Sequence, residues 1–387
     1  MFKYILISSL LYASLYAQSF EVFLKNSIKN SPYLKVSGIN EKQEIQNANI
    51  TNRYKNPSLT LGLSNFTQDI GDAKNGYTVG VTQPVEFFGV SDDKNQLALM
   101  QKQQAKNLAK LSLSEFVMEL SSLYISYKDA TKKVLLVKEE LSILEKILSI
   151  SKARFQNGTI AKVKYMQTQT DKLRVLNSLS DAKREQKQNY YKLLNFAGVV
   201  DEIDIDTNYV FKKNTTIKEP LKLSYEVSKL QTKSASLKLN SHKIEYVNIS
   251  TEFERDADQD ILRVSLEMPF SVFDTKNEER TIAKLESQKS KLLIQSMQNS
   301  LKIKLKELEY AIVSLDESQK SNAKLLKAQK ELLLMYEKSY QIAKTDLIEL
   351  QLIKNQMIQT KEKLNRIELL KEQNIVEYNY LSGDYYE

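Results

Sequence analysis

Residues that could do chemistry are few in this chain of 387 residues. It has no cysteine, one histidine (His242) and eight scattered methionines. Zinc and copper sites need clustered ligands, so no metal site is predicted, and His242 is expected to be a surface histidine. No phosphate-binding loop, catalytic triad spacing or HExxH motif is present. We therefore predict that the chain is not an enzyme and holds no cofactor.

The charges are numerous but mixed. The chain has 56 Lys and Arg against 48 Asp and Glu, a net charge of +8, and the two signs are interspersed rather than clustered. A nucleic-acid site would need a basic patch with aromatic residues, which is not seen. Nine glycines and five prolines are very few breakers for this length, so most of the chain should form long helices.

The N-terminus has the pattern of an export signal. Lys3 precedes an apolar run from residue 5 to residue 16, and Ala17 offers a small residue for cleavage before Gln18. Residues 1–17 are thus expected to be a signal peptide, with a buried N-terminal helix as the alternative. The remaining sequence contains no apolar stretch long enough for a membrane-spanning helix.

An internal repeat dominates the rest of the sequence. Segment 77–92 (YTVGVTQPVEFFGVSD) aligns with segment 262–277 (LRVSLEMPFSVFDTKN), which places Pro84 on Pro269 at an offset of 185 residues. The same offset places Gly158 on Ala343. Two landmarks that share one offset indicate two copies of one unit. We assign the first repeat to 18–198, a linker to 199–219 and the second repeat to 220–387.

Each repeat predicts the same order of elements. A first helix is followed by two strands, a long helix, a turn and a last helix. The first helix is predicted at 20–53 in the first copy and at 220–240 in the second. The long helix is predicted at 91–156 and at 276–341, and the last helix of the first copy at 160–195. Apolar residues alternate with polar ones around 58–64, 77–82 and 262–268, which is typical of strands with one apolar face. Residues 69–76 and 256–260 are predicted hairpin loops. Pro84 and Pro269 are interpreted as the strand-to-helix breaks, because proline cannot donate to a β-ladder.

The long helices predict coiled coils. Their apolar residues recur at a spacing of about 3.5, and 66 residues at 1.5 Å each would span ~100 Å. The fold class is therefore mainly α with a small β part. Four strands cannot close a barrel, and open sheet edges are not tolerated in lipid. If the strands face lipid, several chains must pool them.

Three segments resemble the TolC-type outer membrane efflux family: ARFQNGTIAKVKYMQTQTDKL (153–173), the pair TQPVEFFG (82–89) and EMPFSVFD (267–274), and FEVFLKNSIKNSPYL (20–34). The resemblance implies a homotrimer with a shared twelve-stranded transmembrane β-barrel and a helical tunnel in the periplasm. It also implies a bacterial outer membrane location and two partners, a periplasmic adaptor and an inner-membrane pump such as an RND transporter. Segment 197–219 would lie in the equatorial region.

The resemblance also assigns site residues. Lys164 and Glu349 match positions of the periplasmic aperture, and Tyr340 matches a tyrosine that helps to hold the closed state. Leu352 and Thr345 depart from the family pattern, so an acidic cation-binding ring is not expected. We instead predict a Lys164–Glu349 link that holds the tip closed, with two solvated charges as the alternative. The adaptor-contact tips would be Gly158, Thr159, Ile160, Ala161, Ala343, Lys344, Thr345 and Asp346.

The segment TQPVEFFG most resembles the CzcC/CusC-like heavy-metal group, which suggests heavy-metal cations as the cargo. A multidrug channel or a type I secretion channel is the alternative. A periplasmic adaptor is disfavoured because it would carry one helical hairpin rather than two repeats. A coiled-coil tether is disfavoured because it would have no use for alternating strands.

Overall fold

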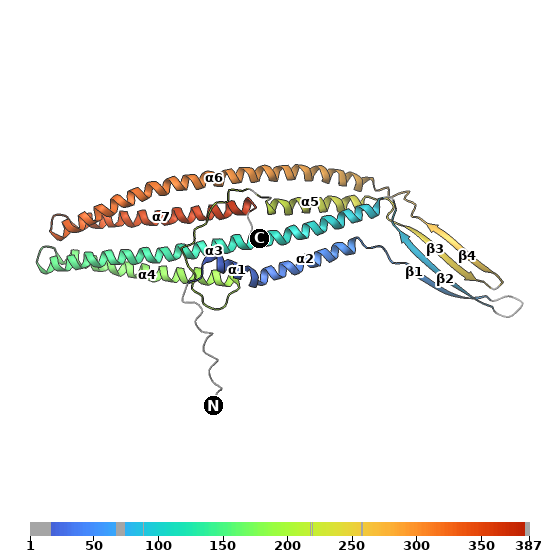
Figure 1. Ribbon diagram of the computed structural model, residues 1–387, viewed down its shortest axis with the longest axis horizontal. Helices are drawn as coiled ribbons and strands as arrows, with labels where there is room; N and C mark the ends of the chain where they lie inside the picture. Colours follow the sequence, from blue (N-terminus) through green and yellow to red (C-terminus); the bar gives the residue numbers. More distant parts are fainter. Residues whose placement is uncertain are drawn as a thin grey trace, which may run out of the picture. The chain divides into compact units, whose positions relative to one another are not determined.

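The computed structural model describes residues 17–66, 74–87, 89–216, 218, 220–256 and 258–383, so nearly all of the predicted signal peptide lies outside the described residues. The elements in chain order (Figure 1) are α1 (Phe20–Asn30), α2 (Pro32–Thr51), β1 (Ser58–Phe66), β2 (Lys74–Val85), α3 (Val90–Gln156), α4 (Lys162–Ala197), α5 (Leu221–Asn240), β3 (Val247–Arg255), β4 (Asp260–Glu267), α6 (Asn277–Gln341) and α7 (Leu347–Leu381).

The chain forms two compact units. The first, here the helical unit, comprises Met1–Lys35, Ser112–Pro220 and Leu301–Glu387. The second, here the sheet unit, comprises Val36–Leu111 and Leu221–Ser300. Each unit takes residues from both predicted repeats, because the long helices α3 and α6 run through both units.

The predicted first helix, 20–53, is wrong as a single helix, because α1 ends at Asn30 and α2 begins at Pro32. Proline has no N–H for an intrahelical hydrogen bond and is favoured at the first helical position. Ser31 fits the position before it, since the Ser31 Oγ accepts a hydrogen bond from the Leu34 N–H at 3.4 Å. The Asn-Ser-Pro sequence therefore starts a second helix.

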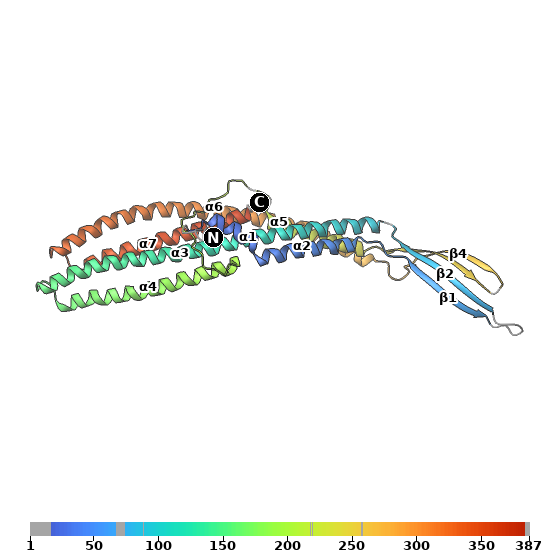
Figure 2. The same cartoon turned by 60° about the horizontal axis from the view of Figure 1, so that its bottom comes forward.

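The 185-residue offset also relates the ends of the helices in the two repeats. α3 ends at Gln156 and α6 at Gln341, and α4 begins at Lys162 and α7 at Leu347. The turns between them match as well: Gly158 has φ of 71° and Ala343 has φ of 62°. Figures 1 and 2 show α3 beside α4 and α6 beside α7. The two predicted long helices agree with α3 and α6 to within one residue at each end.

All four strands form one antiparallel sheet with the order β1-β2-β3-β4 (Figure 1). The two hairpins join through β2 and β3, where Val79 lies opposite Phe253. β2 starts at Lys74, so the predicted loop 69–76 is shorter at its C-terminal end than expected. Cross-strand pairing explains this extension, since Asn65 and Phe66 of β1 lie opposite Asn75 and Lys74.

The core of the helical unit is built around α1. Phe20 lies 4.4 Å from Tyr124 of α3 and 5.2 Å from Phe211, measured between ring centroids. Ile205 is also buried in this core, and Gln18 forms a β-bridge with it. Segment 199–219, predicted as a linker, thus contributes buried side chains to the core. Among the described residues, no helix is both long and apolar enough to cross a membrane.

Candidate functional site

The sheet has one apolar face, and that face is exposed. On β1 it carries Leu59, Leu61 and Leu63, which lie opposite Val81, Val79 and Tyr77 of β2. Leu63 is 94 % exposed and Leu262 on β4 is 70 % exposed. An exposed contiguous apolar surface on a sheet marks a membrane or protein contact rather than a water-facing wall.

The opposite face of the sheet is polar. Arg263 on β4 binds two carboxylates of β3, Glu252 at 2.7 Å and Glu254 at 3.3 Å. Thr82 and Ser250 share a hydrogen bond of 3.2 Å across β2 and β3. The period-two alternation read from the sequence therefore separates the two faces as predicted.

The two predicted strand-to-helix breaks differ in position. Pro84 lies inside β2, opposite Asn248, and the strand continues to Val85. β1 begins at Ser58, which lies opposite Thr82, so Pro84 has no partner on β1. At Pro84, β2 therefore pairs with β3 alone. Pro269 lies two residues beyond the end of β4. A proline at the end of a strand is tolerated where no ladder hydrogen bond is needed from its nitrogen.

Tyr340 is fully buried at the tip of the helical unit, where α3 and α6 end. Its hydroxyl shares a hydrogen bond of 3.0 Å with Ser151 Oγ. The Arg154 guanidinium donates to the Tyr340 carbonyl at 2.9 Å and lies 4.5 Å from the centre of the Tyr340 ring. The end of α3 is thus held to the end of α6 by three contacts through one side chain and its backbone.

Lys164 does not pair with Glu349 in this chain. Lys164 Nζ lies 2.5 Å from Asp346 Oδ1, whereas Glu349 is exposed. The predicted Lys164–Glu349 link is therefore corrected to Lys164–Asp346. The reason is the start of α7: Asp346 is its N-cap and also accepts from the Leu347 N–H at 2.7 Å, which directs the carboxylate toward the turn. The hydrogen bond from Lys164 lowers the pKa of Asp346.

The predicted adaptor-contact residues lie in the two turns. Gly158, Thr159 and Ala161 are exposed between α3 and α4, and Ile160 is half-buried. Ala343 and Lys344 are exposed between α6 and α7, and Thr345 and Asp346 are half-buried. Both turns therefore present backbone and short side chains to the surroundings, and the second turn also exposes Lys344.

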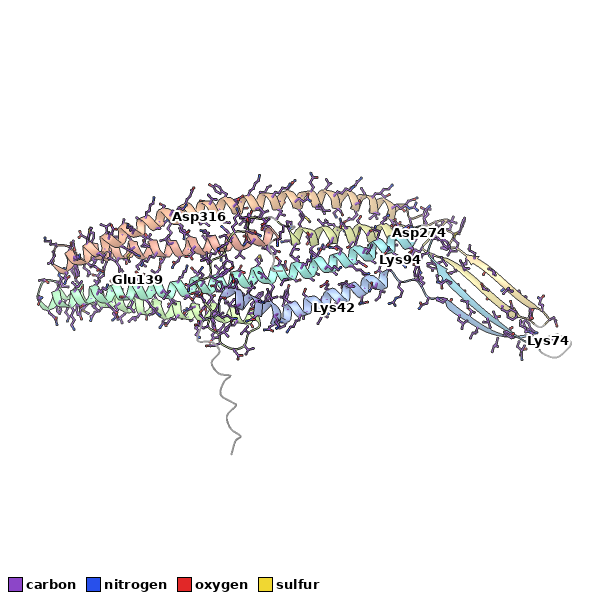
Figure 3. The ribbon with its side chains drawn as sticks, viewed as in Figure 1. Lys42, Lys74, Lys94, Glu139, Asp274 and Asp316 are labelled. Carbon is purple, nitrogen blue, oxygen red and sulfur yellow. The ribbon has the colours of Figure 1, made fainter. Side chains whose placement is uncertain are left out.

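A ladder of ion pairs joins α3 to α7. Here the α3–α7 ladder denotes the pairs Lys354–Glu140 at 2.8 Å, Lys361–Glu139, Lys132–Glu368 at 2.5 Å and Lys128–Glu372 at 2.6 Å. Glu139 is labelled on α3 in Figure 3. On α7, residues 354, 361 and 368 are seven apart, which is the coiled-coil period, so they lie along one side of the helix.

The innermost pair of the α3–α7 ladder is buried. The side chains of Lys128 and Glu372 are both 4 % exposed, and Lys128 Nζ also donates to the Tyr209 carbonyl at 2.8 Å. Burial raises the pKa of Glu372 despite the neighbouring ammonium. Burial also acts to raise the pKa of Glu368, but Lys132 outweighs it and the pKa is lowered.

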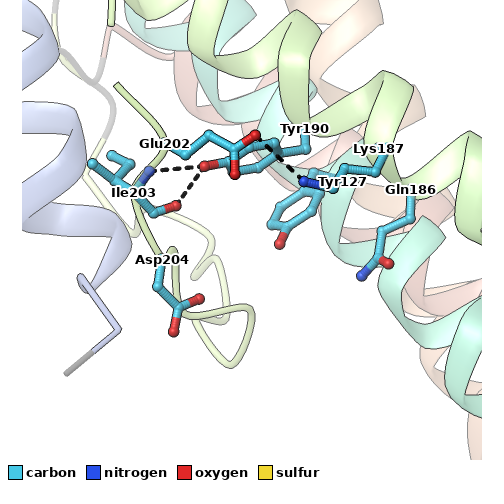
Figure 4. Close-up of a pocket in the computed structure, with 7 residues that line it drawn as sticks. All are labelled: Tyr127, Gln186, Lys187, Tyr190, Glu202, Ile203 and Asp204. Carbon is cyan, nitrogen blue, oxygen red and sulfur yellow. Dashed lines mark hydrogen bonds and ion pairs between the residues drawn. The ribbon is translucent and has the colours of Figure 1, made fainter. Parts of the chain in front are cut away.

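A cavity of about 340 Å³ lies in the helical unit between α3, α4 and segment 199–219 (Figure 4). The Tyr190 hydroxyl donates to the Ile203 carbonyl at 2.6 Å and accepts from the Ile203 N–H at 2.8 Å. Lys187 pairs with Glu202 at 3.5 Å. These polar groups find their hydrogen-bond and ion-pair partners in one another. The contacts hold segment 199–219 against α4. No cluster of three metal-ligating side chains occurs within the described residues.

Residues 23–199 match the family described as "Outer membrane efflux protein". The match covers less than half of the chain, so it shows that this part is similar to the outer membrane efflux protein family. No curated protein matches the chain.

Several solved structures are similar to this chain in fold, and each of the three matches below covers 94 % of its length. CusC matches with 10 % identity and a TM-score of 0.78, over 91 % of that chain. The Campylobacter jejuni CmeC outer membrane channel matches with 12 % identity and a TM-score of 0.75, over 85 % of that chain. VceC from Vibrio cholerae matches with 10 % identity and a TM-score of 0.79, over 96 % of that chain.

These matches confirm the predicted fold class, long antiparallel helices with four strands per chain. The family model that residues 23–199 match describes outer membrane efflux proteins, which agrees with the predicted location in the bacterial outer membrane. CusC is one of several structures of comparable similarity, so the heavy-metal subgroup stays a prediction.

Sequence reasoning missed Asp346 as the partner of Lys164 and also missed the α3–α7 ladder. An Asp immediately before an apolar helical run is an N-cap pattern, which could have identified Asp346. The seven-residue spacing of Lys354 and Lys361 could have indicated a charged stripe on α7. His242, predicted as a plain surface histidine, is half-buried and shares a hydrogen bond of 2.8 Å with Asp93.

Proposed function

We propose that this protein is one subunit of a homotrimeric export channel, the passive exit duct of a tripartite efflux system. The observation that carries the proposal is the two-faced sheet, with an exposed apolar face and a polar, ion-paired face. Such a sheet suits a wall between lipid and water, because lipid-facing and water-facing residues alternate along each strand.

The sheet edges support an assembly. β1 and β4 are edge strands of the four-stranded sheet, and lipid offers no partner for their free backbone groups. Pairing of β4 of one chain with β1 of the next would satisfy both edges. Three chains with four strands each would close a twelve-stranded barrel, in line with the family resemblance.

We place the gate at the tip contacts of Tyr340 with Ser151 and Arg154 and of Lys164 with Asp346. These contacts join the adjacent ends of α3 and α4 to the end of α6 and the start of α7, and the paired residues are far apart in sequence. A periplasmic adaptor would contact the exposed turns around Gly158 and Ala343. Energy would come from an inner-membrane pump such as an RND transporter, since the sequence holds no nucleotide-binding motif.

The proposed cargo is heavy-metal cations, on the resemblance of segment 82–89. A multidrug channel is the alternative, and a type I secretion channel is a further one. Deletion of the gene in its host separates these cargoes. Hypersensitivity to copper, zinc or cobalt salts with unchanged drug sensitivity supports metal export, whereas the reverse pattern supports drug export.

The channel itself is tested with the purified full-length protein in a planar bilayer. The expected result is small, steady, long-lived conductance steps, because a gate held closed at the tip restricts the current. Conductance should be lost together with the trimer when the oligomer is dissociated by heat. A folded trimer that gives no conductance steps contradicts the proposal and would favour a tether or an adaptor.

A further inference from the structure

A basic pocket lies in the sheet unit, where α5 leads into β3 and where α3 and α6 begin. It is lined by Asp93, Lys238, Ser241, His242, Lys243, Ile244 and Arg280 around a cavity of about 430 Å³. Asp93, in the first turn of α3, accepts a hydrogen bond from Lys238 Nζ at 2.8 Å. The second Asp93 oxygen lies 2.8 Å from His242 Nε2.

Two cations of this basic pocket are left without a carboxylate. Asp93 compensates Lys238, but no ion pair of Lys243 or Arg280 occurs in the part of the chain that the structure describes. Three of the lining residues are Lys or Arg and one is Asp, so these four side chains together carry a net charge of +2. An exposed pocket of this charge suits a phosphate, and a guanidinium can bind two phosphate oxygens at once.

An apolar loop lies against the same pocket. Residues 268–273 connect β4 toward α6 and expose Met268, Phe270, Val272 and Phe273, with Phe270 at 86 % and Phe273 at 99 % exposure. The Ser271 Oγ donates a hydrogen bond to the Lys243 carbonyl at 3.3 Å. This contact joins the apolar loop to the backbone of a pocket residue.

We propose that the basic pocket binds the phosphate of a phospholipid headgroup, with the lipid acyl chains against Phe270 and Phe273. Phosphate groups lie just outside the hydrocarbon of a bilayer, and the pocket lies just beyond the ends of strands whose apolar face is exposed. Free phosphate shares the same chemistry, but it would not use the exposed phenylalanines. The inference rests on the proposed insertion of the sheet into the outer membrane.

The test counts phosphatidylglycerol molecules retained by the full-length, delipidated oligomer, using native mass spectrometry over a lipid titration. Lys243→Gln with Arg280→Gln is expected to weaken retention by about tenfold or more. The matched control, Lys106→Gln with Lys291→Gln, removes two exposed charges of the same sheet unit outside the pocket and should retain lipid as the unaltered protein does. Equal retention by the pocket variant and the control overturns the proposal.

Two further experiments distinguish a phospholipid headgroup from free inorganic phosphate. Phe270→Ser with Phe273→Ser should weaken phosphatidylglycerol retention, because the acyl contacts are lost. Unchanged retention in this variant, combined with displacement of the lipid by inorganic phosphate, would show a free-phosphate site and overturn the lipid proposal. If the double charge variant does not assemble, Lys243→Gln alone carries the test, since this side chain is exposed.

Lipid retention tests the basic pocket and conductance tests the channel, so the two proposals can be contradicted independently. The pocket variant should conduct in a planar bilayer as the unaltered protein does, because the pocket lies outside the tip contacts. Loss of lipid retention with normal conductance supports the pocket. Absence of conductance in the unaltered protein contradicts the channel, whatever the lipid result.

Discussion

At the scale of single residues, the proposed gate at the tip depends on a few contacts that are each of modest strength. Lys164 and Asp346 are each about 40 % exposed, at 39 % and 44 %. Exposed ion pairs contribute about 0.2–1 kcal/mol, so this pair stabilises the tip only together with the buried Tyr340 contacts. Single substitutions should therefore change the open fraction of the proposed gate only a few-fold.

Substitution of Lys164 tests this pair. Lys164→Gln removes the ammonium and should raise the open fraction about 1.4- to 5-fold, the range that 0.2–1 kcal/mol gives at 25 °C. Single-channel recording measures the open fraction. Lys162→Gln, on the exposed neighbouring residue, is the matched control, and Lys164→Arg should keep the closed state. An effect of Lys162→Gln as large as that of Lys164→Gln would assign the change to overall charge.

The Lys164–Asp346 pair should also respond to pH in a defined direction. The pKa of Asp346 is lowered by Lys164, so its contribution is present above the ordinary aspartate pKa of about 3.9 and is lost as pH falls through the lower folded-state value. Conductance should stay constant from pH 7 to pH 5 and rise only below about pH 4. A rise already near pH 6 would point to another titrating group.

At the scale of elements, the two tip turns use different residues for one conformation. Gly158 has φ of 71° without a side chain, whereas Ala343 holds φ of 62° with a β-carbon. The left-handed conformation costs an L-residue about 1–2 kcal/mol. The second turn is therefore strained relative to the first.

Reciprocal substitutions test the strain. Ala343→Gly should stabilise the turn and Gly158→Ala should destabilise it, each by about 1 kcal/mol. That corresponds to a roughly fivefold change in local opening, measured by hydrogen–deuterium exchange of the turn amides. No neighbour within 4 Å would obstruct a β-carbon at Gly158, so the effect isolates backbone conformation. The same direction of change in both variants would contradict this explanation.

The α3–α7 ladder makes a second prediction at this scale. Lys128→Met leaves Glu372 buried without its cation and should destabilise the protein by about 3–5 kcal/mol. The double variant Lys128→Met with Glu372→Leu should recover most of this loss, because two apolar residues replace a buried pair at similar volume. Thermal unfolding of the purified protein measures both. A double variant as unstable as the single one would mean that Lys128 acts mainly through the Tyr209 carbonyl.

At the scale of the whole molecule, the proposed insertion of the sheet into the outer membrane can be tested directly. Leu61→Lys places a charge on the exposed apolar face and should cost about 2–4 kcal/mol per chain if that face meets the middle of a bilayer. The outer membrane fraction, separated by density, should lose the variant. Thr60→Lys, on the polar face of the same strand, should remain in that fraction. Equal behaviour of the two variants would contradict a lipid contact for the apolar face.

The sequence by itself determined the duplicated plan, the ends of the long helices and the two faces of the strands. These properties are local: periodicities of two and 3.5 and proline positions act within a few residues. It also pointed to Tyr340 and the two tip turns, through the repeat and the family resemblance.

Only the tertiary structure decided which residues meet. Lys164 had Asp346 and Glu349 within one turn of α7 as partners, and the N-cap geometry of Asp346 selects it. The α3–α7 ladder and the basic pocket likewise join residues more than 140 positions apart. No local pattern contains such pairings, because they depend on how antiparallel helices align along their whole length.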